Sequence, residues 1–284
     1  MKAVLYPNFQ KENALSCAGE VCDILDSLGI EVIVSHEYTA EFGDKPFVKF
    51  ADIASLVGSA DIFIAIGGDG TILRCAKLLI GTETKLLGIN TGTLGFMAGL
   101  EADQLYALKR LKTGEYGLSR RMTVDVVIHT GEGDRIYTAL NEVSARSGSF
   151  KICDFEVYAD NFLIGKYRAD GILFSTPSGS TAYALSAGGP VIEPDLECIE
   201  MNLICPHSLF ARATLFSADR KLRLTDKTMG ENSLVVSVDG DLEHSIGENE
   251  SIEIMRGRHI LNFVDLVDNA FHDSLCRKMC RPIK

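Results

Sequence analysis

The segment from residue 61 to 80, DIFIAIGGDGTILRCAKLLI, places the strongest constraint on how this chain can fold. Its first part, DIFIAIG, is apolar without alternation, a pattern typical of a parallel strand that is covered on both faces. Three glycines around one aspartate follow, and TILRCAKLLI then has the spacing of a helix. A buried strand that passes directly into a helix predicts a βαβ unit, and therefore an α/β fold with a parallel sheet.

The sequence on either side of this segment continues the alternation of strands and helices. Strands are predicted at KAVLY, EVIVS and KLLGIN, and helices at residues 11–28, at KFADIASLV and at ADQLYALKRLKTG, which ends at Gly114. Such alternation is typical of a Rossmann-like parallel sheet. We therefore expect an α/β domain over residues 1–115.

The pattern changes at about residue 116. Short strand-like segments such as MTVDVVIHT, RIYTALNEVSAR, DFEVYADNFL and SLVVSVDGD are separated by Gly, Asn and Asp turns. This pattern predicts a mainly-β domain over residues 116–262. Helical character returns in FHDSLCRKM, so residues 263–284 are expected to return to the first domain.

Composition limits the classes of partner and compartment. The length of 284 residues fits two domains, and the net charge of −11 argues against a nucleic-acid partner. No apolar run is long enough to span a bilayer, and the N-terminus lacks a signal-peptide pattern. The eight cysteines are scattered without a Cys-x-x-Cys pair. We therefore expect a cytoplasmic protein with no membrane partner and no metal site of its own.

The GGDGT loop at residues 67–71 is the first candidate for a phosphate-binding or catalytic site. With Thr71 as the predicted N-cap, the glycines let phosphate oxygens approach a helix N-terminus. A carboxylate there repels phosphate, so Asp69 makes sense as a proton acceptor or as a contact to phosphate through Mg²⁺. Arg74 is expected in the first turn, where a cation is unfavourable unless it faces phosphate. The alternative is an ordinary Asp-Gly turn, and the loop matches neither the G-x-G-x-x-G fingerprint nor a Walker P-loop.

The second segment with candidate binding residues is YRADGILFSTPSGSTAYALSAGGPVIEP, at residues 167–194. Asp170 precedes an apolar strand, and a run of small hydroxyl residues follows it. A helix is predicted to open at Thr181, which places Ala182 and Ser186 on one face near Tyr183. Hydroxyls, peptide groups and an aromatic ring at one helix start suit a ribose and a flat base. The alternative is a Gly/Ser-rich surface loop.

A third, weaker signal is the pair Asn141-Glu142, which interrupts a strand. An amide and a carboxylate can bind ribose hydroxyls or a carboxamide, but an exposed strand pair explains them equally well. Lys151 and Arg168 are candidate phosphate partners, although each alone would be a solvated surface charge.

Taken together, these segments resemble the NAD kinase family. GGDGT, the Asn-Glu pair and DGILFSTPSGSTAYALSAGGP occur in the order and at about the spacing of that family, and ICPHSLFAR and VSVDGD resemble its later blocks. The resemblance covers about residues 61–241. It implies an α/β N-terminal domain, a β-sandwich-like C-terminal domain, an active site between them, and a homodimer or homotetramer.

The resemblance also implies an activity: transfer of the γ-phosphoryl group of ATP, or of polyphosphate, to the 2′-hydroxyl of the adenosine ribose of NAD. Asp69 would be the general base, and Mg²⁺ or another divalent cation would arrive with ATP. The residues implied to bind substrate are Gly70 and Arg74 beside the phosphates, Asn141 and Glu142 on NAD, Asp170 at the nicotinamide end, Thr181, Ala182, Tyr183 and Ser186 on the adenosine side, and Lys151 and Arg168 near the pyrophosphate.

Two positions depart from the family pattern. Ala213 stands where proline is expected, and Asp241 stands where the family often has glutamine. An added carboxylate near phosphate is unfavourable, so Asp241 ranks last among the candidate site residues. Two other functions remain open: a lipid or sugar kinase that shares only the Gly-Gly-Asp-Gly loop, and a dinucleotide-binding regulator without catalysis.

Overall fold

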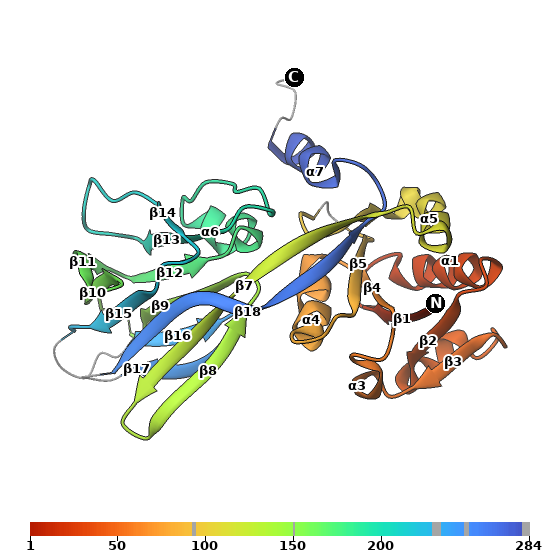
Figure 1. The fold of residues 1–284 in the computed structure, drawn as a ribbon, viewed down its shortest axis with the longest axis horizontal. Helices are drawn as coiled ribbons and strands as arrows, with labels where there is room; N and C mark the ends of the chain where they lie inside the picture. Colours follow the sequence, from red (N-terminus) through yellow and green to blue (C-terminus); the bar gives the residue numbers. More distant parts are fainter. Residues whose placement is uncertain (93–94, 150, 229–233, 247–249, 280–284) are drawn as a thin grey trace. The chain divides into compact units, whose positions relative to one another are not determined.

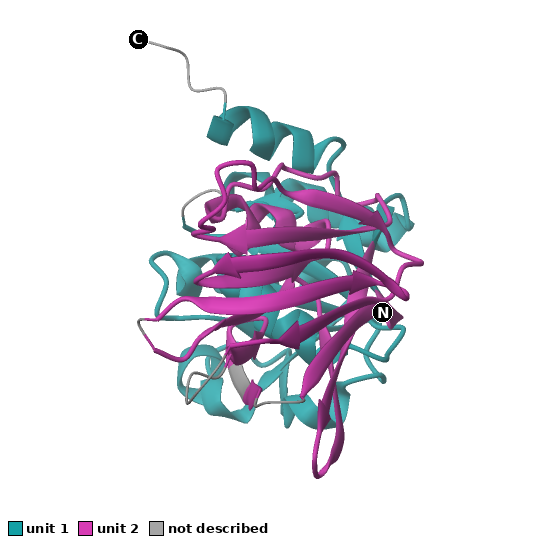
Figure 2. Ribbon diagram, turned by 90° about the vertical axis from the view of Figure 1, so that its left-hand side faces the viewer, with its two compact units in different colours: residues 1–120, 261–284 teal, residues 121–260 magenta. Residues whose placement is uncertain are grey.

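The computed structural model describes residues 1–284 except 93–94, 150, 229–233, 247–249 and 280–284 (Figure 1). The chain divides into two compact units, shown in different colours in Figure 2. Unit 1 comprises residues 1–120 and 261–284, and unit 2 comprises residues 121–260. The sequence-based boundaries were 115/116 and 262/263. Strands β7 (Gly117–Thr130) and β18 (Ser251–Asp265) both pass from one unit into the other.

Unit 1 contains a parallel sheet in the order β5-β4-β1-β2-β3. The strands are β1 Lys2–Pro7, β2 Glu31–Ser35, β3 Val48–Ala51, β4 Ile62–Gly67 and β5 Lys85–Asn90, and the short β6, Leu100–Glu101, pairs with β5. The end of β18 lies parallel to β5, with Phe263 opposite Leu86. Every residue of β4 is buried, as expected for a strand covered on both faces.

The helices of unit 1 follow its strands. They are α1 Ala14–Ser27, α2 Thr39–Phe42, α3 Ile53–Leu56, α4 Asp69–Leu79, α5 Lys109–Thr113 and α7 Ala270–Met279, with 3₁₀ helices at His36–Tyr38 and Ala102–Leu108. Within the described residues, no helix combines the length and apolar character needed to cross a bilayer.

The helix predicted over KFADIASLV is wrong in its first half. Val48–Ala51 forms β3, which pairs in parallel with β2. The helix begins only after Asp52, whose carboxylate accepts a hydrogen bond from the backbone N–H of Ala54 (3.1 Å) and so caps α3.

Unit 2 is built from two antiparallel sheets. One has the order β11-β10-β15-β18 with the β7–β8 hairpin beside β18, and the other has the order β14-β13-β12-β9-β16-β17. The remaining strands are β8 Gly133–Ala139, β9 Glu142–Ser147, β10 Cys153–Ala159, β11 Phe162–Ala169, β12 Gly171–Ser175, β13 Cys198–Ile204, β14 Thr214–Ser217, β15 Leu222–Asp226, β16 Leu234–Val238 and β17 Asp241–Ile246.

Side chains from both sheets form one core in unit 2. Phe155 of β10 and Phe174 of β12 are buried in the same apolar cluster. Two sheets that share a core make a sandwich. The predicted fold class, an α/β domain with a parallel sheet plus a mainly-β sandwich-like domain, is confirmed.

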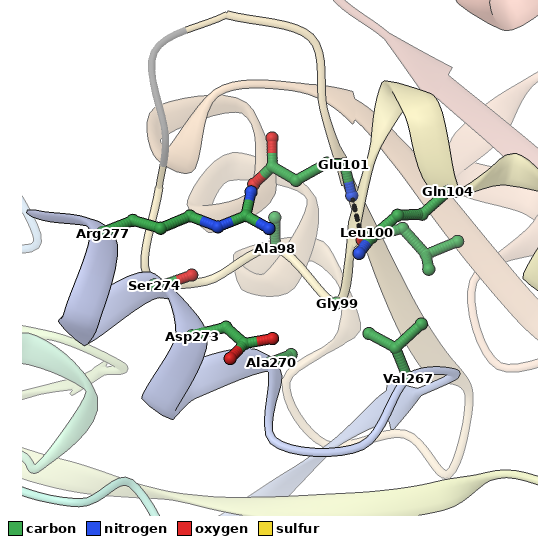
Figure 3. Close-up of a pocket in the computed structure, with 10 residues that line it drawn as sticks. All are labelled: Ala98, Gly99, Leu100, Glu101, Gln104, Val267, Ala270, Asp273, Ser274 and Arg277. Atoms are coloured by element: carbon green, nitrogen blue, oxygen red, sulfur yellow. Dashed lines mark hydrogen bonds between the residues drawn. The ribbon is translucent and has the colours of Figure 1, made fainter.

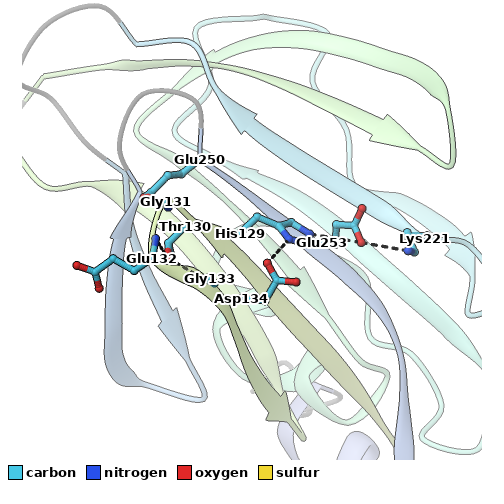
Figure 4. Close-up of polar contacts among 9 residues, drawn as sticks. All are labelled: His129, Thr130, Gly131, Glu132, Gly133, Asp134, Lys221, Glu250 and Glu253. Carbon is cyan, nitrogen blue, oxygen red and sulfur yellow. Dashed lines mark hydrogen bonds and ion pairs between the residues drawn. The ribbon is translucent and has the colours of Figure 1, made fainter.

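A surface network joins the β7–β8 hairpin to β18 (Figure 4). The Nδ1 of His129 lies 2.8 Å from the Oδ1 of Asp134, and its Nε2 lies 3.6 Å from the Oε2 of Glu253. The same Glu253 oxygen lies 3.1 Å from the Nζ of Lys221 on the loop before β15. Partly exposed pairs of this kind contribute about 0–1 kcal/mol each, so the buried core supplies most of the stability here.

Candidate functional site

In unit 1, Asp69 is the first residue of α4, and two backbone amides hold its carboxylate. Its Oδ2 accepts a hydrogen bond from the N–H of Phe96 (2.9 Å), and its Oδ1 accepts one from the N–H of Met97 (3.2 Å). A Cβ on Gly95 would collide with this carboxylate, so only glycine fits there. Asp69 is therefore fixed at the carboxyl end of β4, where parallel sheets bind their ligands.

The glycines of the GGDGT loop differ in what surrounds them: one is required by packing, and two face open space. A Cβ on Gly67 would lie 2.6 Å from the Oγ1 of Thr71, so this position is required by packing. A Cβ on Gly68 or Gly70 would have no described protein atom within 4 Å. The backbone at these two positions therefore faces open space, which agrees with the expected approach of a ligand to the helix start.

Two details predicted for this loop are wrong. The N-cap is Gly68, whose C=O accepts hydrogen bonds from Thr71 (2.8 Å) and Ile72 (3.2 Å), so the helix starts earlier than expected. Thr71 is buried instead, and its Oγ1 accepts a hydrogen bond from the Nδ2 of Asn8 (3.1 Å). Arg74 consequently lies in the second turn, exposed, beside a cavity of 320 Å³ that Asn8 and Tyr38 also line.

In unit 2, the carboxylate of Asp239 holds the loop between β8 and β9. Its Oδ2 accepts a hydrogen bond from the N–H of Leu140 (2.8 Å), and its Oδ1 accepts from Asn141 (2.8 Å) and Glu142 (3.0 Å). Asp239 itself has a positive φ of 48° at the turn after β16. A buried carboxylate bonded to successive amides fixes their peptide planes, and therefore the directions of the side chains of Asn141 and Glu142.

Both of these side chains carry buried oxygens that no group of the described residues satisfies. Among the described residues, the Oδ1 of Asn141 and the Oε2 of Glu142 are buried without a hydrogen-bond partner. Burial, and secondarily the negative charge of Asp239, raises the pKa of Glu142 to about 7, while the backbone of Tyr183 lowers it by hydrogen bonding. Unsatisfied buried oxygens on two successive residues are unusual in a purely structural loop and are typical of a ligand site.

The STPSGSTAY segment packs directly on this loop. The N–H of Thr176 donates to the C=O of Asn141 (2.8 Å), and a Cβ on Gly179 would collide with the same carbonyl. Arg146 of β9 places its guanidinium carbon 5.9 Å from the centroid of the Tyr183 ring. The structure therefore brings Asn141, Glu142 and Tyr183 together.

The helix predicted to open at Thr181 is wrong. Residues Ser178–Thr181 form a 3₁₀ turn, Ala182 interrupts it with φ −100° and ψ −122°, and the helix α6 covers only Tyr183–Ser186. Local hydroxyl bonds compete with helix formation here: the Oγ of Ser180 donates to the C=O of Pro177 (2.7 Å) and accepts from Ile192 (3.0 Å).

Comparison with known families covers both units. Residues 4–116 match the ATP-NAD kinase N-terminal domain, and residues 140–266 match the ATP-NAD kinase C-terminal domain. The chain belongs to the NAD kinase family. The NAD kinase of Moorella thermoacetica is 33% identical over 276 residues, which cover 96% of this chain and 87% of that relative.

Solved structures of similar proteins agree with the family. An NAD kinase from Archaeoglobus fulgidus, solved in complex with ATP, aligns with a TM-score of 0.72 at 25% identity and covers 96% of each chain. Yeast NADH kinase, solved with NADH, aligns with a TM-score of 0.89 at 19% identity, covering all of this chain and 88% of its own. At that identity, the second comparison shows the fold alone.

Other residues implied by the NAD kinase resemblance lie on exposed parts of unit 2. Asp170 joins β11 to β12, Lys151 precedes β10, Ser186 ends α6, and Asp241 begins β17. Arg168 of β11 has its Nε 3.7 Å from the Oδ1 of Asp154 and lines a separate cavity of 420 Å³. Within the described parts of the chain, neither Lys151 nor Arg168 has a hydrogen bond or ion pair with Asn141, Glu142 or Tyr183.

The sequence did not indicate several residues that support the candidate site residues within each unit. Asp239 lies in the VSVDGD block, but its role depends on amides about a hundred positions earlier. The run TGTLGFMAG follows the buried strand β5 and contains the amides that hold Asp69. Glycines after a buried parallel strand were the available signal for this second loop.

Proposed function

We propose that this chain is an NAD kinase that transfers the γ-phosphoryl group of ATP to the 2′-hydroxyl of the adenosine ribose of NAD, with Asp69 as the general base. The observation that carries the proposal is the fixed carboxylate of Asp69 beside an open glycine loop at a helix N-terminus. Membership of the family and the ATP complex of the Archaeoglobus fulgidus relative support ATP as the donor. Polyphosphate is the alternative donor.

The proposed reaction needs little covalent chemistry from the protein. The 2′-oxygen of the ribose forms a bond to the γ-phosphorus, the bond from this phosphorus to the β,γ-bridging oxygen breaks, and its electron pair leaves with ADP. The proton of the hydroxyl passes to the carboxylate of Asp69. Gly68 and Gly70 leave room for phosphate oxygens near the start of α4, whose N–H groups favour negative charge.

The dinucleotide would be held by residues of unit 2. The buried oxygens of Asn141 and Glu142 can accept hydrogen bonds from ribose hydroxyls or from a carboxamide. Tyr183 offers a half-buried ring for a base, with Thr181 and Ala182 beside it. Asp170, Ser186, Lys151, Arg168 and Asp241 complete the proposed set on the strength of the family resemblance.

We further propose that Mg²⁺ reaches the protein as part of the ATP substrate. In the part of the chain that the structure describes, no group of three or more His, Cys, Asp or Glu side chains is placed to hold a metal ion. Mg²⁺ usually keeps several waters and binds through substrate phosphates. A cytoplasmic location is also proposed from the composition, and a homodimer or homotetramer from the family resemblance; light scattering of the purified protein tests the second.

The decisive experiment supplies the protein with NAD, ATP and Mg²⁺ and measures NADP with an NADP-specific dehydrogenase. Parallel reactions replace ATP with polyphosphate, or NAD with diacylglycerol or a sugar. We expect NADP in the first reaction. Phosphorylated lipid or sugar without NADP would favour the second kinase hypothesis, and NAD binding without transfer would favour the regulator.

A further inference from the structure

The C-terminal helix α7 contacts the residue that holds the Asp69 carboxylate. The ring of Phe271 lies 6.1 Å from the ring of Phe96, measured between centroids, and the Nζ of Lys278 lies 4.0 Å from the centroid of the same ring. Phe96 is 7% exposed, and its backbone N–H donates to Asp69. Two side chains of α7 therefore pack on the residue whose main chain orients the carboxylate.

A second contact joins α7 to the other end of the same segment. Ser274 and Arg277 line a small pocket with residues 98–101 (Figure 3), where the Arg277 side chain extends toward Glu101. Burial raises the pKa of Glu101, while a hydrogen bond from Asn90 and the positive charge of Arg277 lower it. That bond runs from the Nδ2 of Asn90 to the Oε2 of Glu101 (2.8 Å). Side chains of α7 thus pack on Phe96 at one end of the segment 96–101 and line a pocket with Glu101 at the other.

The helix itself is short, and most of its described residues are exposed. It is 10 residues long, too short to be stable alone in water, and Ser274 is its buried residue among those described. Phe271, Ser274 and Lys278 are spaced three and four apart, so they share one face of the helix. The contacts of this face with Phe96 therefore help to fix α7, and in turn α7 restricts the movement of Phe96.

We propose that α7 positions the Asp69 carboxylate, with Phe271 and Lys278 holding Phe96 so that its N–H keeps the carboxylate aimed at the hydroxyl it deprotonates. This inference rests on the proposed function, because it takes Asp69 as the base. Phe271 and Lys278 are positioning residues that act through Phe96. Loosening them lowers the rate of the chemical step and leaves substrate binding in place, because small misplacements of a reacting group are costly.

The test compares changes at exposed and half-buried positions of the same helix. Lys278→Met keeps the length of the side chain without its charge, Lys278→Arg keeps a cation over the ring, and Phe271→Ala removes the aromatic contact. We expect kcat for NADP formation to fall about threefold to tenfold in Lys278→Met and further in Phe271→Ala. The KM values for NAD and ATP should stay within about twofold, and Lys278→Arg should restore kcat. Met279→Ala, an exposed change on the same helix, is the matched control.

Hydrogen exchange gives a readout that does not depend on activity. The amides of Phe96 and Met97 should exchange faster in Lys278→Met than in the parent protein, while those of β1 should be unchanged. Unaltered kcat and unaltered exchange in Lys278→Met would overturn the proposal, as would a raised KM at constant kcat or an equal loss in Met279→Ala. Should Phe271→Ala not fold, the exposed Lys278→Met decides alone. A parent protein that makes no NADP refutes the proposed function. The exchange result would still show whether α7 restrains the backbone of Phe96 and Met97.

Discussion

A single substitution at Asp69 can separate turnover, which is proposed to need its carboxylate, from NAD binding, which is proposed to depend on other residues. Asp69→Asn keeps the shape of the side chain but removes the proton acceptor, so turnover should fall by at least about 100-fold, in the range typical of general-base catalysis. NAD binding should persist, because the residues proposed to bind NAD lie in unit 2. Steady-state kinetics with calorimetric titration of NAD checks both statements. Near-normal turnover in the variant would remove Asp69 from the role of base.

Glu142 gives the protein a stability that depends on pH in an unusual direction. Its pKa rises from the ordinary 4.5 to about 7 in the folded chain, chiefly through burial. The folded state therefore binds the proton more tightly, and this group's contribution to stability is present below about pH 4.5 and is lost as pH rises to about 7. Glu142→Gln should be more stable than the parent at pH 8, by on the order of 2 kcal/mol.

Thermal unfolding of both proteins at pH 5 and pH 8 measures this effect. The advantage of Glu142→Gln should shrink at pH 5, where the parent carboxyl is protonated in the folded state. The same advantage at both pH values would mean that ionisation of Glu142 is not its cause.

Individual residues show which parts of the site a sequence can reveal. Asp69 was found because its glycine neighbours are adjacent in the chain, and its role as base remains a prediction. Asp239 was missed as a support because the amides it binds precede it by 97 to 99 positions. Nothing local distinguishes such a carboxylate from that of an ordinary turn aspartate.

At the scale of elements, the start of α4 offers a matched pair of glycine substitutions. Gly70→Ala adds a methyl group where no described protein atom lies within 4 Å, so the fold should be unaffected or stabilised by up to about 1 kcal/mol. The same methyl group would occupy space needed by phosphate, and the KM for ATP should rise about fivefold or more.

Gly67→Ala is the contrasting variant, because its Cβ would lie 2.6 Å from the Oγ1 of Thr71. It should lose about 1–3 kcal/mol of stability through overpacking. Urea unfolding and ATP titrations of the two variants separate the two effects. If Gly70→Ala unfolds easily, or binds ATP normally, the open side of the loop is not where phosphate approaches.

Elements with strong periodicity were predictable, and elements shaped by side-chain hydrogen bonds were not. The buried strand β4 and the helix α1 follow directly from apolar patterns. The segment after Pro177 has helical spacing, but the hydroxyl of Ser180 bonds within the segment and to Ile192, and the helix shortens to four residues. Such competition depends on the fold around the segment rather than on propensity.

On the scale of the whole molecule, unit 1 is completed only by the end of the chain. Val264 and Leu266 are buried in the same cluster as Leu87 and Ile89 of β5. Val264→Ala should therefore destabilise the protein by about 2 kcal/mol, although it lies far in sequence from the GGDGT loop. Urea unfolding measures the loss, with the half-buried neighbour Asn262→Ala as control. Equal stability of Val264→Ala and the parent would contradict the packing role of this segment.

The fold class could be predicted at this scale because the pattern of predicted helices and strands separates an alternating α/β region from a β-rich one. The domain boundaries at 115/116 and 262/263 remain predictions. Strands β7 and β18 run without a linker through the divisions between the two units, at 120/121 and 260/261. A continuous strand carries no Gly- or Pro-rich signal at the point where it changes units.

The unsatisfied oxygens of Asn141 and Glu142 also bear on how long the protein survives. A dinucleotide that donates hydrogen bonds to these oxygens would bind the folded chain but not the unfolded chain. At 100 times its Kd, it would add about 2.7 kcal/mol to the free energy of unfolding. We expect NAD to raise the melting temperature by an amount that Asn141→Ala abolishes, and a differential scanning titration measures this. Since proteases act on opened chains, the abundance of the protein would follow the supply of its own substrate.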